Sequence, residues 1–285
     1  MQEFKKEIIE NEDEISLNDM DRSARYAKDL VNGLATVRKF EQGVTIFGSA
    51  RFAEDTKWYE LAQELGAKLA AAGHAVVTGG GPGIMEAANR GAYGAGGRSV
   101  GMNIHLATEQ DLNPYTTDSM EFHYFFSRKL MMTLSAKAYV FFPGGFGTMD
   151  EFSEILELKH TGKSVDTPIF LVGKEFWQGL DDWFAGPMSK WNLIETGKKG
   201  EMREIDFREN PASEFLEKGE APKLPRKLAA DEQIHHAVEN ARDLYVITDN
   251  MDEIVAAVNE LDPKENSQKI ADILRDDKRS FSRKK

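Results

Sequence analysis

The most restrictive feature of this sequence is a short apolar run that ends in a glycine-rich turn, AYVFFPGGFGTMDE at residues 138–151. Residues 139–142 are β-branched or aromatic, which is typical of a strand buried on both faces. Pro143 ends the strand, and the three glycines that follow let a ligand approach the backbone closely. The pattern therefore predicts a strand, a tight turn and the start of a helix.

The end of this turn carries the signals of a helix N-terminus. Thr148 occupies the position expected of an N-cap, and Asp150 and Glu151 are expected in the first helical turn. Free N–H groups and the positive end of the helix dipole suit a phosphate at such a place. An acid in the first turn is ordinary for structure alone. Beside a bound phosphate the same acid points to chemistry, so both interpretations of Glu151 stay open.

Two further glycine turns follow apolar runs earlier in the chain. Gly48 and Ser49 come after residues 44–47, and the segment GGGPG at 79–83 comes after residues 74–78. Strands and helices alternate, which predicts an α/β fold, a Rossmann-like doubly wound parallel sheet with helices on both faces. The carboxyl ends of parallel strands share one edge, so we expect the three turns to converge there. Strands are expected at 44–47, 74–78, 99–104, 139–142, 168–172 and 244–248, and helices at 57–72, 84–93, 128–137, 148–161, 176–191 and 251–261.

The rest of the chain predicts additions to this unit. Residues 1–40 are expected to form an accessory N-terminal helical extension, packed on the domain or on a second subunit. Residues 41–262 form the nucleotide-binding domain, in which the charged, proline-bearing stretch at about 197–241 is a surface insertion. Residues 263–285 are a charged tail. Residues 105–120 are expected to be a polar loop, and 122–126 fit either a strand or a helix start.

The composition argues against several classes of protein. The chain has no cysteine, which excludes disulfides, thiolate catalysis and cysteine metal sites. No apolar run approaches the 18 residues or so of a membrane span, and no signal core precedes the domain, so we expect a cytoplasmic protein that does not bind membranes. The net charge of −12 argues against nucleic-acid binding. The histidines show no ligand spacing, so no metal is expected.

Two common nucleotide motifs do not fit. In the dinucleotide fingerprint G-x-G-x-x-G the third glycine would fall at Glu86 when counted from Gly81, and at Asp150 when counted from Gly145. Gly162-Lys163-Ser164 resembles the end of a Walker loop, but residue 157, where that loop needs its first glycine, is a glutamate. A nicotinamide cofactor and a Walker-type site are thus disfavoured, and no cofactor is expected.

Four polar residues outside the turns each allow two interpretations. Arg128 and Lys129 follow the aromatic run 122–126, where they either bond carboxylates at a helix start or place Arg128 to grip an anion or pair with Glu151. Glu86 and Asn89 are one turn apart on the helix after the second glycine turn, off the face that we expect to be core. They are either a capping or solvated pair, or they bond the base or sugar of a ligand.

Three segments together resemble the LONELY GUY (LOG) family, the cytokinin riboside 5′-monophosphate phosphoribohydrolases. They are GGGPGIMEAANRGA at 79–92, Arg128-Lys129-x-x-Met132, and PGGFGTMDE at 143–151. Bacterial members are often labelled "possible lysine decarboxylase". The resemblance spans roughly residues 44–194 and resumes at 244–261. It implies hydrolysis of a nucleoside 5′-monophosphate, AMP or a cytokinin riboside monophosphate, to the free base and ribose 5-phosphate.

The resemblance also implies roles for individual residues. Arg128 and Glu151 are the expected catalytic pair, in which Arg128 holds Glu151 ionised. The expected ligand is a purine nucleotide, bound without metal or cofactor by a homo-oligomer, a dimer or larger. The first helix and Trp177, Trp183 and Trp191 are candidates for the subunit contact. The expected substrate-binding residues are Ser49, Gly80, Gly81, Gly83, Glu86, Asn89, Lys129, Gly144, Gly145, Gly147 and Thr148.

Two other functions remain open from the sequence. A lysine decarboxylase would need a pyridoxal phosphate Schiff base, for which Lys129 and Lys137 are the lysines expected near the site. A nucleotide-binding carrier or sensor would keep the glycine turns but would need neither Arg128 nor Glu151.

Overall fold

A computed structural model describes residues 17–39, 43–104, 112–161, 163, 167–191, 193–194 and 244–261. The insertion expected at 197–241, the tail expected at 263–285 and residues 105–111 of the expected polar loop lie outside the described residues.

The described part of the chain contains one parallel sheet of seven strands, in which the order of strands reverses between its two halves. The first strand of the chain and the fifth lie side by side at the centre, and each half grows outward from them. A crevice at such a switch point is where open α/β sheets bind ligands. From one edge to the other the strands are β4 (Asp118–Phe122), β3 (Ser99–Ile104), β2 (Val76–Thr78), β1 (Gly43–Phe47), β5 (Ala136–Phe141), β6 (Ile169–Leu171) and β7 (Val246–Ile247).

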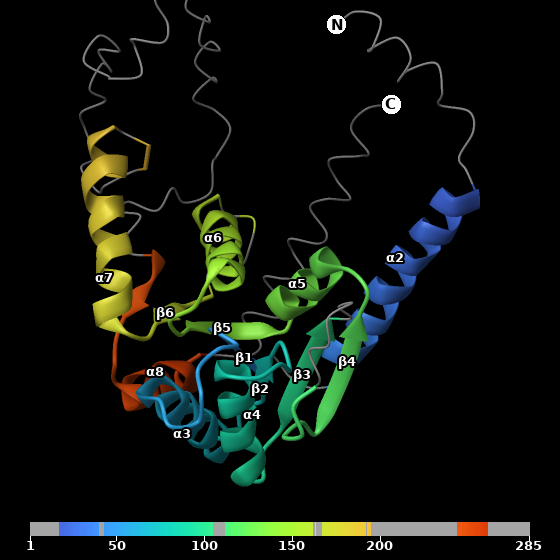
Figure 1. The fold of residues 1–285 in the computed structure, drawn as a ribbon, viewed down its shortest axis with the longest axis horizontal. Coiled ribbons are helices and arrows are strands. Elements are labelled where there is room, and N and C mark those ends of the chain that lie inside the picture. Colours follow the sequence, from blue (N-terminus) through green and yellow to red (C-terminus); the bar gives the residue numbers. More distant parts are fainter. Residues whose placement is uncertain are drawn as a thin grey trace, which may run out of the picture.

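Helices cover both faces of the sheet (Figure 1). One face carries α3 (Lys57–Ala71), α4 (Ile84–Gly94) and α8 (Met251–Asn259). The other carries α2 (Leu17–Val37), α5 (Phe125–Leu134), α6 (Phe146–His160) and α7 (Lys174–Trp183), which continues into a π-helical turn, η1 (Phe184–Met188). The expected doubly wound α/β fold is confirmed.

The central strand β5 shows why the sheet needs both layers. Tyr139 and Phe141 belong to the core under α5, α6 and α7, whereas Ala138 and Val140 belong to the core under α3 and α8. Successive side chains of a strand point to opposite faces, so an uninterrupted apolar run requires two apolar layers. Full burial of one such side chain contributes roughly 1.5–3 kcal/mol.

Several elements differ from the sequence expectation. Strand β4 at the sheet edge falls partly in the expected loop, because its alternating exposed and half-buried residues give no apolar run. The helix expected to run to residue 191 changes at Phe184 into the π-helical turn η1, which contains Pro187, and the helical run then continues to residue 190. Trp177 is 1% exposed and lies in the core, so the expectation that it supplies a subunit contact is wrong. Trp183 and Trp191 are exposed.

The N-terminal helix α2 packs on the domain, against α5 and β4 (Figure 1). Close contact is possible because Gly33 lies directly against the side chains of Met131 and Phe122. None of the helices within the described ranges is both long and apolar enough to cross a membrane.

Candidate active site

The turns after β1 and β5 and the start of α4 meet at the carboxyl edge of the sheet. The Ser49 N–H donates to the Pro143 carbonyl (3.0 Å), and the Ile84 N–H donates to the Ser49 carbonyl (3.1 Å). A side chain at Gly83, which has φ +67°, would collide with Ser49 and Ala50. The convergence expected from the sequence is therefore present, with Ser49 at its centre. The Ser49 hydroxyl accepts a hydrogen bond from the Arg51 N–H (3.1 Å).

The start of α6 is open to a ligand. Gly145 is the N-cap and has no side chain to cap the free N–H groups of the first turn. Gly145, Phe146 and Gly147 are all exposed. The first N–H groups of a helix lack an intrahelical partner, and the positive end of the helix dipole lies at the same place. This geometry suits a phosphate.

Thr148 is not the N-cap, and that expectation is wrong. The helix begins at Phe146, so Thr148 lies within its first turn, where it is buried. A methyl group on Gly144 would collide with the Thr148 side chain, which makes the two residues one packed unit. No acid lies in the first turn, and Glu151 therefore sits one turn further along α6 than expected.

Arg128 of α5 and Glu151 of α6 face each other across the site. The Arg128 Nη2 atom lies 3.6 Å from Glu151 Oε1, and the side chains are only 11% and 15% exposed. The Arg128 guanidinium fills the space that a side chain on Gly79 would need. The pair thus joins two helices to the turn after β2, in agreement with the interpretation that Arg128 pairs with Glu151.

Burial decides the protonation behaviour of this pair. Desolvation raises the pKa of Glu151 to about 7, although the positive charge of Arg128 acts to lower it. Burial also lowers the pKa of Arg128, against the opposing effect of the Glu151 charge. Arg128 acts in the expected direction, since its charge favours the ionised form of Glu151, but the loss of hydration outweighs the ion pair. A carboxyl group with a pKa near 7 can both take up and release a proton at neutral pH.

Arg128 also retains an unused donor. Its Nε atom is buried and has no hydrogen-bond partner among the described residues. A buried polar group without a partner is costly. An oxygen atom of a ligand beside Glu151 would supply the missing acceptor.

Lys129 pairs with different carboxylates from its neighbour Arg128. Its Nζ atom lies 3.0 Å from Asp150 Oδ2 and also pairs with Glu154. Burial acts to lower its pKa, but the hydrogen bonds to Glu154 and Asp150 outweigh that effect and the pKa is raised. Lys129 thus links α5 to the outer face of α6.

The second glycine turn is largely closed by internal bonds. The Gly80 N–H donates to Thr78 Oγ1 (2.9 Å), and the carbonyls of Gly80 and Gly81 accept from Asn113 Nδ2 (3.0 and 3.2 Å). Gly80 has φ +73°, a conformation that favours glycine. Asn113 lies in the segment expected to be only a polar loop, yet it fixes this turn.

Asn89 and Glu86 both bond within the protein. Asn89 is fully buried, so its placement off the core face of α4 is wrong. Its Oδ1 accepts from Thr78 Oγ1 (2.6 Å), and its Nδ2 donates to Ser99 Oγ (2.8 Å). Glu86 accepts from the Tyr59 hydroxyl (2.9 Å). These contacts indicate that Asn89 anchors the glycine turn and that Glu86 ties α4 to α3.

A cleft of about 370 Å³ opens beside Ser49 and Gly144. Its walls are formed by the aromatic side chains of Phe52, Trp58 and Phe176, with Pro143 and Glu175. The sequence reasoning missed these aromatic residues because they lie on three separate segments. The only local signal is that each follows shortly after the end of a strand on the same edge.

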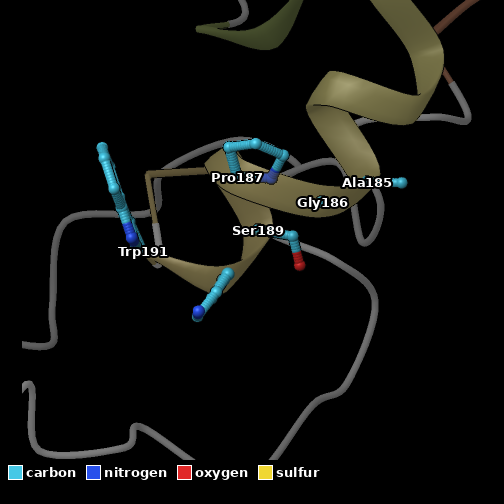
Figure 2. Close-up of a pocket in the computed structure, with 6 residues that line it drawn as sticks. Ala185, Gly186, Pro187, Ser189 and Trp191 are labelled. Atoms are coloured by element: carbon cyan, nitrogen blue, oxygen red, sulfur yellow. The ribbon is translucent and has the colours of Figure 1, made fainter. Parts of the chain in front are cut away.

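A second hollow, of about 550 Å³, lies at the turn after α7 (Figure 2). It is lined by Ala185, Pro187, Lys190 and Trp191, among others. None of the expected site residues contributes to it, so the candidate site remains the sheet edge that carries Ser49, the start of α6 and the Arg128–Glu151 pair.

Comparison with known proteins points to one family. A family model described as "Possible lysine decarboxylase" matches residues 85–212. A protein of Mycobacterium tuberculosis named cytokinin riboside 5′-monophosphate phosphoribohydrolase is 31% identical over 141 residues, which cover 48% of this chain and 72% of that protein. A protein of the same name from Rhodococcoides fascians is 29% identical over 149 residues, 51% of this chain and 75% of that protein.

Solved structures of related shape include the molybdenum cofactor carrier protein of Chlamydomonas reinhardtii. It is 24% identical with a TM-score of 0.41, over 52% of this chain and 87% of that one.

Proposed function

This chain belongs to the LONELY GUY (LOG) family, and from that membership we propose that it hydrolyses the N-glycosidic bond of a nucleoside 5′-monophosphate to the free base and ribose 5-phosphate. The relatives named above carry phosphoribohydrolase in their names. AMP or a cytokinin riboside monophosphate is the proposed substrate.

One observation carries the proposal. Glu151 is a buried carboxyl group, 3.6 Å from Arg128 and with a pKa raised to about 7, one helical turn behind an open helix N-terminus. A phosphate held by that N-terminus would leave the sugar of the nucleotide within reach of the carboxyl group. A site that only bound an anion would gain nothing from a buried acid.

The phosphate is proposed to bind the N–H groups at the start of α6. Gly144, Gly145, Gly147 and Thr148 form this cradle, and Ser49 closes it from the turn after β1. Binding at a part of the substrate remote from the reacting bond supplies energy for positioning the sugar. Gly80, Gly81 and Gly83 are proposed to support the cradle through Ser49 and Gly79 rather than to touch the phosphate. The proposed substrate-binding set does not include Glu86, Asn89 and Lys129, because each of these side chains is bonded to other residues.

Glu151 is proposed to act on the sugar. Breaking the bond between the anomeric carbon and the base nitrogen passes through a sugar cation, which a nearby carboxylate stabilises. Water adds to the anomeric carbon, its proton passes to Glu151, and Glu151 hands a proton to the departing base. A carboxyl group that titrates near 7 fits both transfers.

Arg128 is proposed to orient the ribose. Its buried Nε atom lacks a partner among the described residues, and a ribose hydroxyl would supply an acceptor. Its positive charge also limits how far burial raises the pKa of Glu151.

The hypothesis that the protein is a lysine decarboxylase has less support. A Schiff-base lysine is activated by a lowered pKa, whereas the pKa of Lys129 is raised by its two carboxylate partners. Lys137 lies near the start of β5, with its Nζ atom 2.7 Å from His74 Nδ1. That is the amino end of the strand, so the expectation that Lys137 is near the site is wrong.

Assembly and location are also proposals. We propose a homo-oligomer, because α5 and the start of α6 expose Phe125, Phe126, Leu130 and Phe146, and clustered exposed apolar side chains mark association surfaces. The proposed ligand is a small purine nucleotide and not a nucleic acid, given the net charge of −12. A cytoplasmic location rests on the sequence argument alone.

The test is incubation of the purified protein with AMP, followed by chromatography of the products. The proposal predicts adenine and ribose 5-phosphate in equal amounts. Glu151→Gln, prepared in the same way, is the control for contaminating enzymes, and a contaminating phosphatase would release adenosine instead. Tight binding of AMP with no release of base from any purine nucleotide would favour the carrier or sensor.

A further inference from the structure

We propose that Asp29 of the N-terminal helix α2 is a positioning residue for Arg128, because it caps the start of α5 from a distant segment of the chain. The inference rests on the proposed function, in which Arg128 holds the ribose. It makes α2 a working part of the site instead of the accessory extension expected from the sequence.

The contacts of Asp29 converge on the two residues that lead into α5 and on Ser127 in its first turn. Its Oδ2 accepts from the N–H of His123 (2.9 Å), the N–H of Tyr124 (3.3 Å) and the hydroxyl of Ser127 (2.9 Å). Its Oδ1 lies 3.3 Å from the His123 ring nitrogen Nδ1. Asp29 is only 4% exposed, so its carboxylate faces α5 and not solvent.

Helix α5 has no cap of its own. Its N-cap residue is Tyr124, whose side chain makes no capping hydrogen bond, and its first turn contains no acid. Aspartate and asparagine side chains commonly bond the free backbone groups at helix starts, and their loss destabilises the first turn. A negative charge at this end also interacts favourably with the positive end of the helix dipole. Asp29 therefore fixes the two residues before α5 and Ser127 in its first turn, and it places beside that turn the negative charge that the local sequence lacks.

The rest of α2 fixes the direction from which Asp29 approaches. The ring of Tyr26 meets Tyr124 edge-on at 4.4 Å between centroids, and it meets Phe126 at 5.2 Å. One helical turn after Asp29, Gly33 packs directly on Met131. The cap, the aromatic contact and the glycine contact together hold both ends of α5.

Arg128 is the next residue after Ser127, so the cap acts on it directly. The Arg128 N–H donates to the Tyr124 carbonyl (3.2 Å) in the same turn that Asp29 holds. The Arg128 guanidinium must fit between Gly79 and Glu151. A displacement of about 1 Å in a catalytic group can cost about 10²-fold in rate. Loosening the first turn of α5 should therefore reduce turnover before it affects phosphate binding, which depends on α6.

The experiment compares Asp29→Ala, Asp29→Asn and the matched control Asp21→Ala in the full-length protein. Asp21 is an exposed aspartate on the same helix. For each variant kcat and KM for AMP are measured separately, and hydrogen exchange is followed for the amides of residues 124–131. Exchange reports on α5 without reference to activity.

We expect kcat of Asp29→Ala to fall by about tenfold or more while KM stays within about threefold, with faster exchange in α5. Asp29→Asn keeps an acceptor oxygen for the N–H groups and should retain at least about a third of kcat, because asparagine caps nearly as well as aspartate. Asp21→Ala should match the wild type in all three measurements.

A wild-type kcat in Asp29→Ala would overturn the inference. So would an activity that falls only in proportion to the fraction of protein that still binds AMP. If Asp29→Ala does not fold, Ser127→Ala replaces it, since it removes the side-chain donor of α5 to Asp29; an unchanged kcat there would overturn the inference equally. A wild-type protein that releases no base would refute the proposed function instead, and the exchange rates would still decide whether Asp29 orders α5.

Discussion

Arg128 and Glu151 are separated by 3.6 Å between Nη2 and Oε1, yet the pKa of the glutamate is raised to about 7 rather than lowered. Both side chains are largely shielded from water, and the cost of desolvating the carboxylate exceeds the attraction of the cation. A pKa near 7 places the gain and loss of a proton by Glu151 in the neutral pH range, unlike that of a carboxylate in a solvent-exposed salt bridge.

Replacing the acid should separate catalysis from binding. Glu151→Gln keeps the size and hydrogen-bonding capacity of the side chain but cannot exchange a proton. We expect kcat for AMP hydrolysis to fall by about 10²-fold or more, which is the scale of general acid–base catalysis. The dissociation constant for AMP, measured by calorimetry, should change by less than about threefold. Near-normal release of adenine would remove Glu151 from the mechanism.

The dependence of the rate on pH should report the same carboxyl group. If the ionised form of Glu151 receives the proton of water, kcat/KM should rise with pH and level off above about 7. Because the charge of Arg128 acts to lower this pKa, Arg128→Met should move the rise to higher pH. Arg128→Lys keeps the charge and serves as the control, with a rise close to that of the wild type. A rise that does not move in Arg128→Met would show that another group titrates.

The stability of the fold should depend on pH through Glu151. Its pKa is about 7 in the folded protein against 4.5 for an unperturbed glutamate, so the folded state binds the proton more tightly than the unfolded chain. The stabilisation is fully present below about pH 4.5 and is lost as the pH rises through 7. The span of the shift corresponds to ~3 kcal/mol.

Urea unfolding of the wild type and Glu151→Gln at pH 5 and pH 8 measures this effect. From pH 5 to pH 8 the free energy of unfolding should fall more in the wild type than in the variant. The difference should be at most ~3 kcal/mol. An equal change in both proteins would mean that Glu151 does not carry the proton.

The glycine turn before α6 offers a matched pair of substitutions. A side chain at Gly144 would collide with Thr148, whereas a side chain at Gly145 meets nothing within 4 Å. Gly144→Ala should therefore lower both the melting temperature and the affinity for AMP. Gly145→Ala should leave the melting temperature within about 2 °C, since surface changes rarely exceed about 0.5 kcal/mol. It should still raise KM by about tenfold, because its methyl group would occupy the place of the phosphate. Unchanged KM in Gly145→Ala would move the phosphate site away from this turn.

The sequence predicted the sheet and its site edge well, because both depend on local patterns. Apolar runs that end in glycine turns are strong signals, and all six expected strands lie within three residues of those in the structure at both ends. The sixth, at 244–248, is shorter in the structure, where β7 is Val246–Ile247. Strand β4 was missed because it is an edge strand with alternating exposure and no apolar run.

What the sequence misjudged depends on contacts between distant segments. Thr148 was expected to cap α6 from its residue type, but the helix begins at a glycine and a phenylalanine that carry no capping signal. Asn89 was expected on an open face, and its burial follows from Thr78 and Ser99 on two other strands. The capping of α5 by Asp29 joins residues 94 to 98 positions apart. No local pattern reports such a bond.

The central claim is tested most directly by a crystal structure of Glu151→Gln with AMP bound. The account predicts the phosphate on the N–H groups of residues 145–148, the anomeric carbon of the ribose next to the side chain of residue 151, and Arg128 bonded to the sugar. A nucleotide bound elsewhere, or a residue 151 turned away from the ribose, would contradict it.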